Sequence, residues 1–118
     1  MAQSAKEPQD FLPLNTAEFH IMLVLAHADL HGYGIMQRIE IQSEGLIKMG
    51  PGTLYTTIKR LLERGWIEEV EPPANADDPR RKYYRLTGFG SRVLEAEAGR
   101  MARVVETARS LGLLGGFA

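Results

Sequence analysis

The sequence predicts a mainly α-helical domain that carries one small β-hairpin. Apolar residues recur at helical spacing in the segments before residue 65 and after residue 87. Between these segments, two short runs rich in aromatic and β-branched residues, 66–70 and 82–86, flank a loop rich in Pro, Asn and Asp. This order of helices, hairpin and final helix predicts a winged helix-turn-helix followed by a C-terminal dimerisation helix.

The composition is that of one globular domain. The chain has 118 residues, of which 44% are hydrophobic and 25% charged, and these are ordinary globular values. Cys is absent, which excludes disulfides and thiolate metal sites. No apolar run is long enough to span a bilayer, and the residues after Met1 do not have the charged and then apolar pattern of a signal peptide. We therefore expect a cytoplasmic protein.

Four segments are expected along the chain. Residues 1–13 mix polar residues with two prolines and predict a flexible N-terminal arm. Residues 14–86 make up the predicted winged helix domain, and residues 87–112 the C-terminal helix. Residues 113–118 form a Gly-rich tail for which the sequence indicates no role.

The first two helices precede a Gly-Pro turn. Asn15 and Glu18 have the spacing of a capping box and open a helix to about His27. This helix is apolar nearly all round, which predicts burial between its own domain and a partner. Residues 30–34 are interpreted as a turn that leads into a second helix over 33–43.

The third helix is the element around which the chain is organised. Pro51 suits a first helical position, and Gly65 is a candidate C-terminal cap. Leu54, Ile58 and Leu61 lie on one face. The remaining surface carries small hydroxyls, one aromatic ring and two cations, from Thr53, Thr56, Tyr55, Lys59 and Arg60. A helix of this kind suits the major groove of DNA, although a merely solvated face would look similar.

The charge distribution supports a local cationic patch. The net charge of the chain is −1, but residues 48–85 carry 8 Lys and Arg against 6 Asp and Glu, whereas residues 1–47 carry 2 against 6. Arg80, Arg81 and Lys82 follow the hairpin loop, where they can contact phosphates or a minor groove. A charge run is often only a solvated turn, but its position beside the third helix favours a role with DNA.

The final helix, from Gly88 to about Leu111 with Thr87 as its cap, has an apolar stripe that is broken by Glu97. The stripe either folds back on the domain or pairs with a second copy, and we favour a homodimer. The candidate dimer residues are Phe19 and Leu23 of the first helix and Leu94, Ala98, Met101, Val104, Val105, Ala108 and Leu111 of the last.

Four segments in order resemble the PadR family of transcriptional regulators, namely residues 31–35, 50–55, 61–67 and 80–87. The resemblance covers about residues 14 to 110 and is greatest for compact members with a single terminal helix. It implies a winged-helix repressor that is dimeric through its C-terminal helix, binds a pseudo-palindromic operator and, in many members, responds to a small aromatic or drug-like molecule. The final helix lacks Trp and Tyr, so an aromatic sandwich for a flat drug cannot be carried over.

The resemblance also implies roles for individual residues. The major groove would be met by Thr53, Tyr55, Thr56, Lys59 and Arg60, and phosphates would be held by Arg80, Arg81 and Lys82. Tyr33, at the start of the second helix, would touch a phosphate or belong to the core.

Other classes of protein are less well supported. The sequence has no phosphate-cradling loop and no nucleophile elbow, so we expect no enzyme and no cofactor. His20, His27 and His31 have spacings that suggest a metal site, but a buried or capping role is favoured and we expect no bound metal. The alternative function is a winged helix that binds protein without DNA. The exposed cations argue against it, because protein interface cores are depleted of charge.

Overall fold

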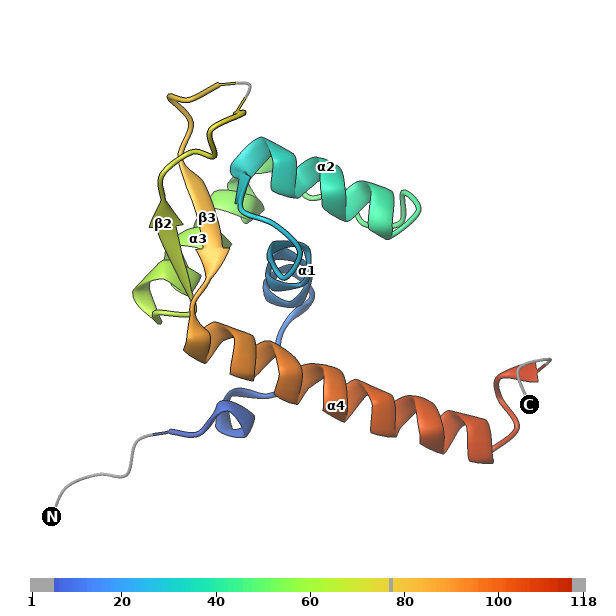
Figure 1. The fold of residues 1–118 in the computed structure, drawn as a ribbon. Coiled ribbons are helices and arrows are strands. Elements are labelled where there is room, and N and C mark those ends of the chain that lie inside the picture. Colours follow the sequence, from blue (N-terminus) through green and yellow to red (C-terminus); the bar gives the residue numbers. More distant parts are fainter. Residues whose placement is uncertain (1–5, 77, 116–118) are drawn as a thin grey trace, which may run out of the picture.

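The computed structural model describes residues 6–76 and 78–115 of the chain (Figure 1). Over these residues the elements are η1 Pro8–Phe11, α1 Thr16–Leu25, β1 Leu30–His31, α2 Gly32–Gln42, α3 Pro51–Glu63, β2 Ile67–Val70, β3 Tyr83–Leu86 and α4 Gly88–Ser110. The helices and the small antiparallel sheet confirm the predicted fold class. None of the helices in this part of the chain combines the length and apolar content that a membrane span requires.

Helix α1 lies at the centre of the domain and contacts α2, α3, α4 and β3. Ile21, Met22 and Val24 have no exposed surface. Fully burying one such side chain stabilises the fold by roughly 1.5–3 kcal/mol. The all-round apolar character of α1 is therefore explained by neighbours within the chain, and burial of these residues needs no partner. The predicted capping box is confirmed, with the Glu18 N–H donating to Asn15 Oδ1 at 2.8 Å.

The sheet has a third strand that the sequence did not predict. Strand β1 pairs with β3 through Leu30 and His31, which lie opposite Tyr84 and Tyr83, and the strand order in the described residues is β1-β3-β2. Two residues are too few for an alternating pattern to appear, so residues 30–34 had the signature of a turn only. The pairing fixes the hairpin, which is the wing, against the start of α2.

Helix α3 begins and ends where the sequence indicated. Pro51 is its first residue, and Gly65 follows it with a φ of +74°, a left-handed conformation that favours glycine. The Trp66 N–H donates to the Leu61 carbonyl, and the Gly65 N–H to the Leu62 carbonyl, both at 3.0 Å. This Schellman motif turns the chain directly into β2 and sets the wing beside α3.

The start of α4 is locked to the end of α3. The Thr87 hydroxyl donates to the Gly65 carbonyl at 2.6 Å and accepts from the Gly90 N–H at 3.0 Å, which confirms Thr87 as the helix cap. A Cβ atom on Gly90 would overlap the Trp66 carbonyl. Trp66 itself is 1% exposed, so its predicted role in core packing is confirmed.

The N-terminal segment is not loose throughout. The short helix η1 packs against α4, and the Phe11 ring lies 5.1 Å from the Trp66 ring and 6.0 Å from the Phe89 ring between centroids. A flexible arm was expected over residues 1–13, but Pro8–Phe11 form a short helix that the Phe11 ring holds in place. This helix is too short to show a periodic pattern in the sequence. Residues 1–5 lie outside the described part of the chain.

Glu97 breaks the apolar stripe of α4 for a structural reason. Its side chain is fully buried, accepts from the Leu14 N–H at 2.8 Å and is bonded to the Arg100 guanidinium. The bonds from Arg100 and from Leu14 lower the pKa of the Glu97 carboxyl, although burial opposes them. Glu97 therefore ties the N-terminal segment to α4.

Candidate nucleic-acid interface

The outer face of α3 carries short hydroxyl side chains and a lysine. Thr53, Thr56 and Lys59 are exposed, and Tyr55, on the side toward the wing, is 50% exposed. On the opposite side of the helix, Leu54 is fully buried. The short side chains leave the helix backbone accessible, which a helix in the major groove requires.

The guanidinium of Arg60 lies beside a carboxylate of α1. Its Nη1 lies 3.3 Å from Glu18 Oε2, and the Nη1 of Arg64 lies 3.0 Å from the same oxygen. The side chain of Glu18 is only 7% exposed, so the carboxylate needs these partners. The two arginines therefore tie α3 to the first turn of α1.

Two of the three wing cations contact a wing carboxylate. Asp78 Oδ1 accepts from the Arg80 backbone N–H at 3.0 Å and from Arg80 Nε at 3.3 Å, and Asp78 Oδ2 lies 3.6 Å from Arg81 Nε. These contacts, led by the Arg80 backbone bond, lower the pKa of the Asp78 carboxyl. Arg80 is nearly fully exposed, with 90% of its side-chain surface accessible.

Arg81 also holds the wing against α2. Its Nη1 lies 3.3 Å from His31 Nδ1, and its guanidinium sits 5.6 Å from the centre of the Tyr33 ring. His31 Nδ1 accepts from the Gly34 N–H at 2.9 Å and so caps α2, as a capping histidine was expected to do. Tyr33 is 50% exposed and lies beside the wing, not in the core.

Lys59 and Lys82 differ from the arginines around them. Among the residues that the structure describes, neither forms an ion pair with a carboxylate. Both are exposed, one on the outer face of α3 and the other on the wing. These two ammonium groups are available to an external anion without displacing an internal one.

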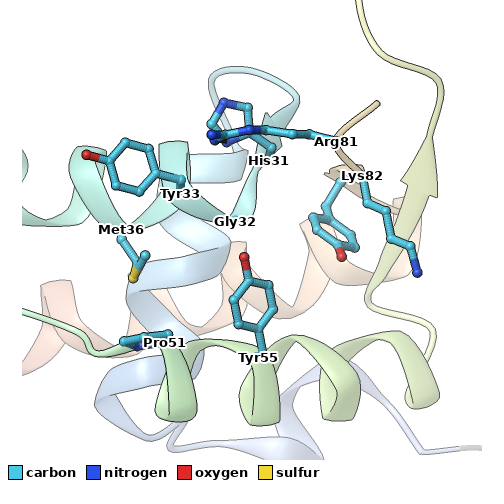
Figure 2. A pocket seen from close by; sticks show the side chains of 9 residues that line it. His31, Gly32, Tyr33, Met36, Pro51, Tyr55, Arg81 and Lys82 are labelled. Atoms are coloured by element: carbon cyan, nitrogen blue, oxygen red, sulfur yellow. Dashed lines mark hydrogen bonds between the residues drawn. The ribbon is translucent and has the colours of Figure 1, made fainter. Parts of the chain in front are cut away.

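A cavity of about 440 Å³ lies between α2, α3 and the wing (Figure 2). Its lining includes the side chains of Tyr33, Met36, Tyr55, Arg81, Lys82 and Tyr84. The Tyr55 hydroxyl points toward the backbone of Gly32, and a Cβ atom on that glycine would overlap the hydroxyl. Of the predicted DNA-binding residues, the structure thus gathers Tyr33, Tyr55, Arg81 and Lys82 around one hollow.

Sequence reasoning missed three residues that shape this surface. Glu18 was assigned only a capping role, His31 was not linked to the wing, and Asp78 was treated as part of a loop. Each contact joins residues whose approach depends on the fold or on loop conformation. A signal was present only for Asp78, which lies within three residues of two arginines.

The predicted dimer residues fall into three groups. Leu94 is 6% exposed and belongs to the core of its own domain, so its side chain is already covered within the chain. Phe19, Leu23, Met101 and Ala108 are half-buried. The others are exposed: Val104 (56%), Val105 (47%) and Ala98 lie on the surface of α4, and Leu111 (68%) directly follows the helix.

The metal interpretation of the histidines finds no geometric support. Within residues 6–76 and 78–115, no group of three or more His, Asp or Glu side chains is placed to hold a metal ion. Burial lowers the pKa of the His20 imidazole, so a neutral ring is favoured at neutral pH.

The arrangement of α2, α3 and a sheet-borne wing defines the class of protein: a winged helix-turn-helix protein. A sequence model described as the transcriptional regulator PadR-like family matches residues 21–96. The chain belongs to this family.

The chain is also similar to individual proteins. An uncharacterized 37.1 kDa protein in transposon TN4556 of Streptomyces fradiae is 36% identical over 90 residues, which are 76% of this chain but only 24% of that protein. An uncharacterized protein of Lysinibacillus sphaericus is 30% identical over 86 residues, 73% of this chain and 78% of that one. The crystal structure of a PadR family transcription regulator from Clostridium difficile shares the fold, with a TM-score of 0.69 at 23% identity over 82% of this chain and 98% of that chain.

Proposed function

We propose that the chain is a sequence-specific DNA-binding repressor that works as a homodimer on a pseudo-palindromic operator. The observation that carries this proposal is the unpaired state of Lys59 and Lys82 beside the exposed hydroxyls of α3, within the described residues. Exposed cations next to a helix of small outer side chains suit a phosphate backbone and a major groove.

Helix α3 supplies base contacts in this proposal, and the wing supplies backbone contacts. Thr53, Thr56 and Lys59 face the groove from the outer side of α3, and Tyr55 meets it from the side toward the wing. Arg80, Arg81 and Lys82 hold phosphates from the wing, and Tyr33 lies next to them at the start of α2. Arg60 serves chiefly to hold α1 against α3, because one of its guanidinium nitrogens contacts the buried Glu18.

The dimer forms through the second half of α4. Val104, Val105 and Leu111 expose apolar surface along that half, and a second copy would cover it. Met101 and Ala108 continue the same strip, and Ala98, Phe19 and Leu23 border it. In a two-fold dimer the two α3 helices would sit about 34 Å apart, or a multiple of that distance, to meet successive turns of DNA.

Membership of a family of transcriptional regulators supports a regulatory role and not an enzymatic one. Repression, release by a small molecule and action in the cytoplasm are parts of the proposal. A bound dimer blocks a promoter by occupying it, and a ligand that binds only the free form shifts the equilibrium away from DNA.

Selection of DNA from genomic fragments with the purified protein tests the proposal. The recovered sequence should have two-fold symmetry, and affinity for it should exceed affinity for a scrambled duplex by at least about 10³-fold. Absence of binding to every duplex at low salt would instead indicate a winged helix that binds protein.

The dimer is tested by Val105→Glu, with Arg103→Glu as the matched control about 160° around the helix. Val105→Glu should yield a monomer in sedimentation and weaken operator binding by roughly 10²-fold or more, because two linked half-sites lose their avidity. Arg103→Glu should remain dimeric. A dimeric Val105→Glu protein that still binds the operator would contradict the proposed interface.

A further inference from the structure

His31 joins the sheet, the start of α2 and the wing. It is the second residue of β1, where it lies opposite Tyr83 of β3, and it directly precedes α2. Its ring meets the Tyr83 ring edge-on at 5.2 Å between centroids, and its Nδ1 accepts from the Gly34 N–H at 2.9 Å. Strand pairing, ring contact and helix cap together fix the orientation of the imidazole.

The imidazole is a neutral acceptor in this arrangement. Because Nδ1 accepts from the Gly34 N–H, it carries no proton, and the ring hydrogen lies on Nε2. A Cβ atom at position 34 would lie 3.3 Å from Cε1 of His31, inside the ordinary carbon contact distance of about 3.5–4.0 Å. Gly34 therefore lets the ring lie against the first turn of α2, with Nδ1 at the helix start.

The Arg81 guanidinium meets the same nitrogen. Its Nη1 lies 3.3 Å from His31 Nδ1, and its carbon lies 5.6 Å from the centre of the Tyr33 ring. Asp78 contacts it at Nε, at 3.6 Å. A guanidinium carries more N–H donors than these contacts use, and the Arg81 side chain is 44% exposed, so donors remain for an external acceptor.

Arg80 and Arg81 differ in how firmly the fold holds them. Among the described residues, Arg80 contacts Asp78 but not α2, and its side chain is 90% exposed. An arginine that is free in solvent has to be ordered when it binds a phosphate, which lowers affinity by a few-fold to about tenfold. Arg81 is ordered in the free protein, and the imidazole that orders it cancels none of its charge.

We propose that His31 is a positioning residue for DNA binding: its neutral imidazole holds the Arg81 guanidinium in the orientation in which it meets a phosphate. Figure 2 shows the Arg81 side chain extending from the wing to His31 at the start of α2. The inference rests on the proposed function, in which Arg81 contacts the DNA backbone. It adds that the wing and the first turn of α2 act as one unit, because a single nitrogen caps the helix and orients the guanidinium.

Two substitutions that cap a helix equally well test the neutral acceptor. Asn and Asp are comparable caps, and each places an oxygen as many bonds from Cα as Nδ1 of histidine. His31→Asn should bind the selected duplex within about twofold of wild type. His31→Asp should bind it about fivefold more weakly than His31→Asn at about 0.15 M salt, because its carboxylate cancels one charge that faces a phosphate. Equal affinity of the two variants would overturn the proposal.

The same pair of substitutions shows whether His31 acts through Arg81. In an Arg81→Gln background the difference between Asn and Asp at position 31 should fall below about twofold, since the charge that Asp cancels is gone. In an Arg80→Gln background, the matched control, the full difference should remain. A difference that persists in Arg81→Gln would reduce the role of position 31 to its own charge and overturn the assignment.

The order of the guanidinium is measured on the full chain without DNA. In NMR relaxation experiments the Arg81 Nε–H order parameter should exceed that of Arg80 in wild type, fall to the Arg80 value in His31→Ala, and recover in His31→Asn. Equal order parameters for the two arginines in wild type would overturn the proposal even if His31→Ala failed to fold. Failure of the chain to bind any duplex would reject the proposed function and leave the NMR result standing.

Discussion

The two flanks of α3 carry similar positive charge and use it differently. On the flank toward α1, Arg60 and Arg64 both contact the buried Glu18, at 3.3 and 3.0 Å. On the flank toward the wing, Lys59 and Lys82 have no carboxylate partner within the described residues. The first flank is tied to α1, whereas the second borders the cavity between α2, α3 and the wing.

A count of cations therefore does not identify a DNA-binding surface. Arg60 and Arg64 share one internal carboxylate, so their net charge is only +1 and the contact holds both side chains against α1. An exposed ammonium without a partner keeps its full charge for a phosphate. The position of each Asp and Glu therefore matters as much as that of each Lys and Arg.

The largest expected effect comes from removing both unpaired lysines. Lys59→Gln combined with Lys82→Gln should weaken DNA binding by roughly 30-fold at 0.15 M salt, since each phosphate contact contributes about 0.9 to the salt exponent. Fluorescence anisotropy with operator and scrambled duplexes measures the loss. The double variant Arg60→Gln with Arg64→Gln leaves Glu18 without these partners, so its folding is first checked by circular dichroism. The folded variant should change affinity by less than about twofold. The comparison breaks down if the two double variants lose affinity equally.

A substitution on the flank toward α1 should change the stability of the fold instead of the affinity for DNA. Glu18→Gln removes the charge that both arginines contact, and we expect a loss of about 1–2 kcal/mol in the free energy of unfolding. This figure is below that of a fully buried pair because the side chains of Arg60 and Arg64 are 39% and 41% exposed. Urea denaturation at pH 7 measures it. No change in the midpoint would mean that Glu18 does not hold the helices together.

Helix α4 has a similar arrangement, in which the buried Glu97 carboxylate forms an ion pair with Arg100. The lowered pKa of Glu97 in the folded state stabilises the fold above the unfolded value of about 4.3, and this contribution is lost as the pH falls through the folded pKa. Wild type should therefore exceed Glu97→Gln by about 1–2 kcal/mol at pH 7. The gap should close as the pH falls below the unfolded value and through the lowered pKa of Glu97. Urea titrations at a series of pH values would show a constant gap if Glu97 had no such role.

The smallest effect is expected at the wing tip. Asp78→Asn removes the carboxylate beside Arg80 and Arg81, so both guanidiniums turn fully to an external anion. Affinity for scrambled DNA should rise, by no more than about fivefold at 0.15 M salt, as one effective charge is restored. Asn keeps the shape and the turn propensity of Asp, so the substitution removes the charge without changing the local structure. Weaker binding would show that Asp78 orders the wing for DNA.

Local chemistry made much of the fold predictable. Pro51, Gly65 and Thr87 act within one helical turn of the atoms they affect, so the ends of α3 and the start of α4 could be placed from sequence. Strand β1 and helix η1 were missed because two and four residues are too few to show a period.

The interface could be predicted in outline only. Spacing placed Thr53, Thr56 and Lys59 on an exposed face, and the structure agrees. The bond between Arg60 and Glu18 joins residues 42 positions apart, and no local pattern announces it. Likewise, the stripe on α4 was visible as a period, but only the fold shows that Leu94 is covered while Val104 lies open.

The salt dependence of operator binding distinguishes which flank of α3 contacts phosphates. Log affinity against log salt should fall less steeply in the Lys59→Gln and Lys82→Gln double variant than in wild type, by about 1.8 in slope, because two phosphate contacts are gone. The Arg60→Gln and Arg64→Gln double variant should keep the wild-type slope. An unchanged slope in the lysine variant, with the decrease appearing in the arginine variant, would place DNA on the other flank of α3 and contradict the account.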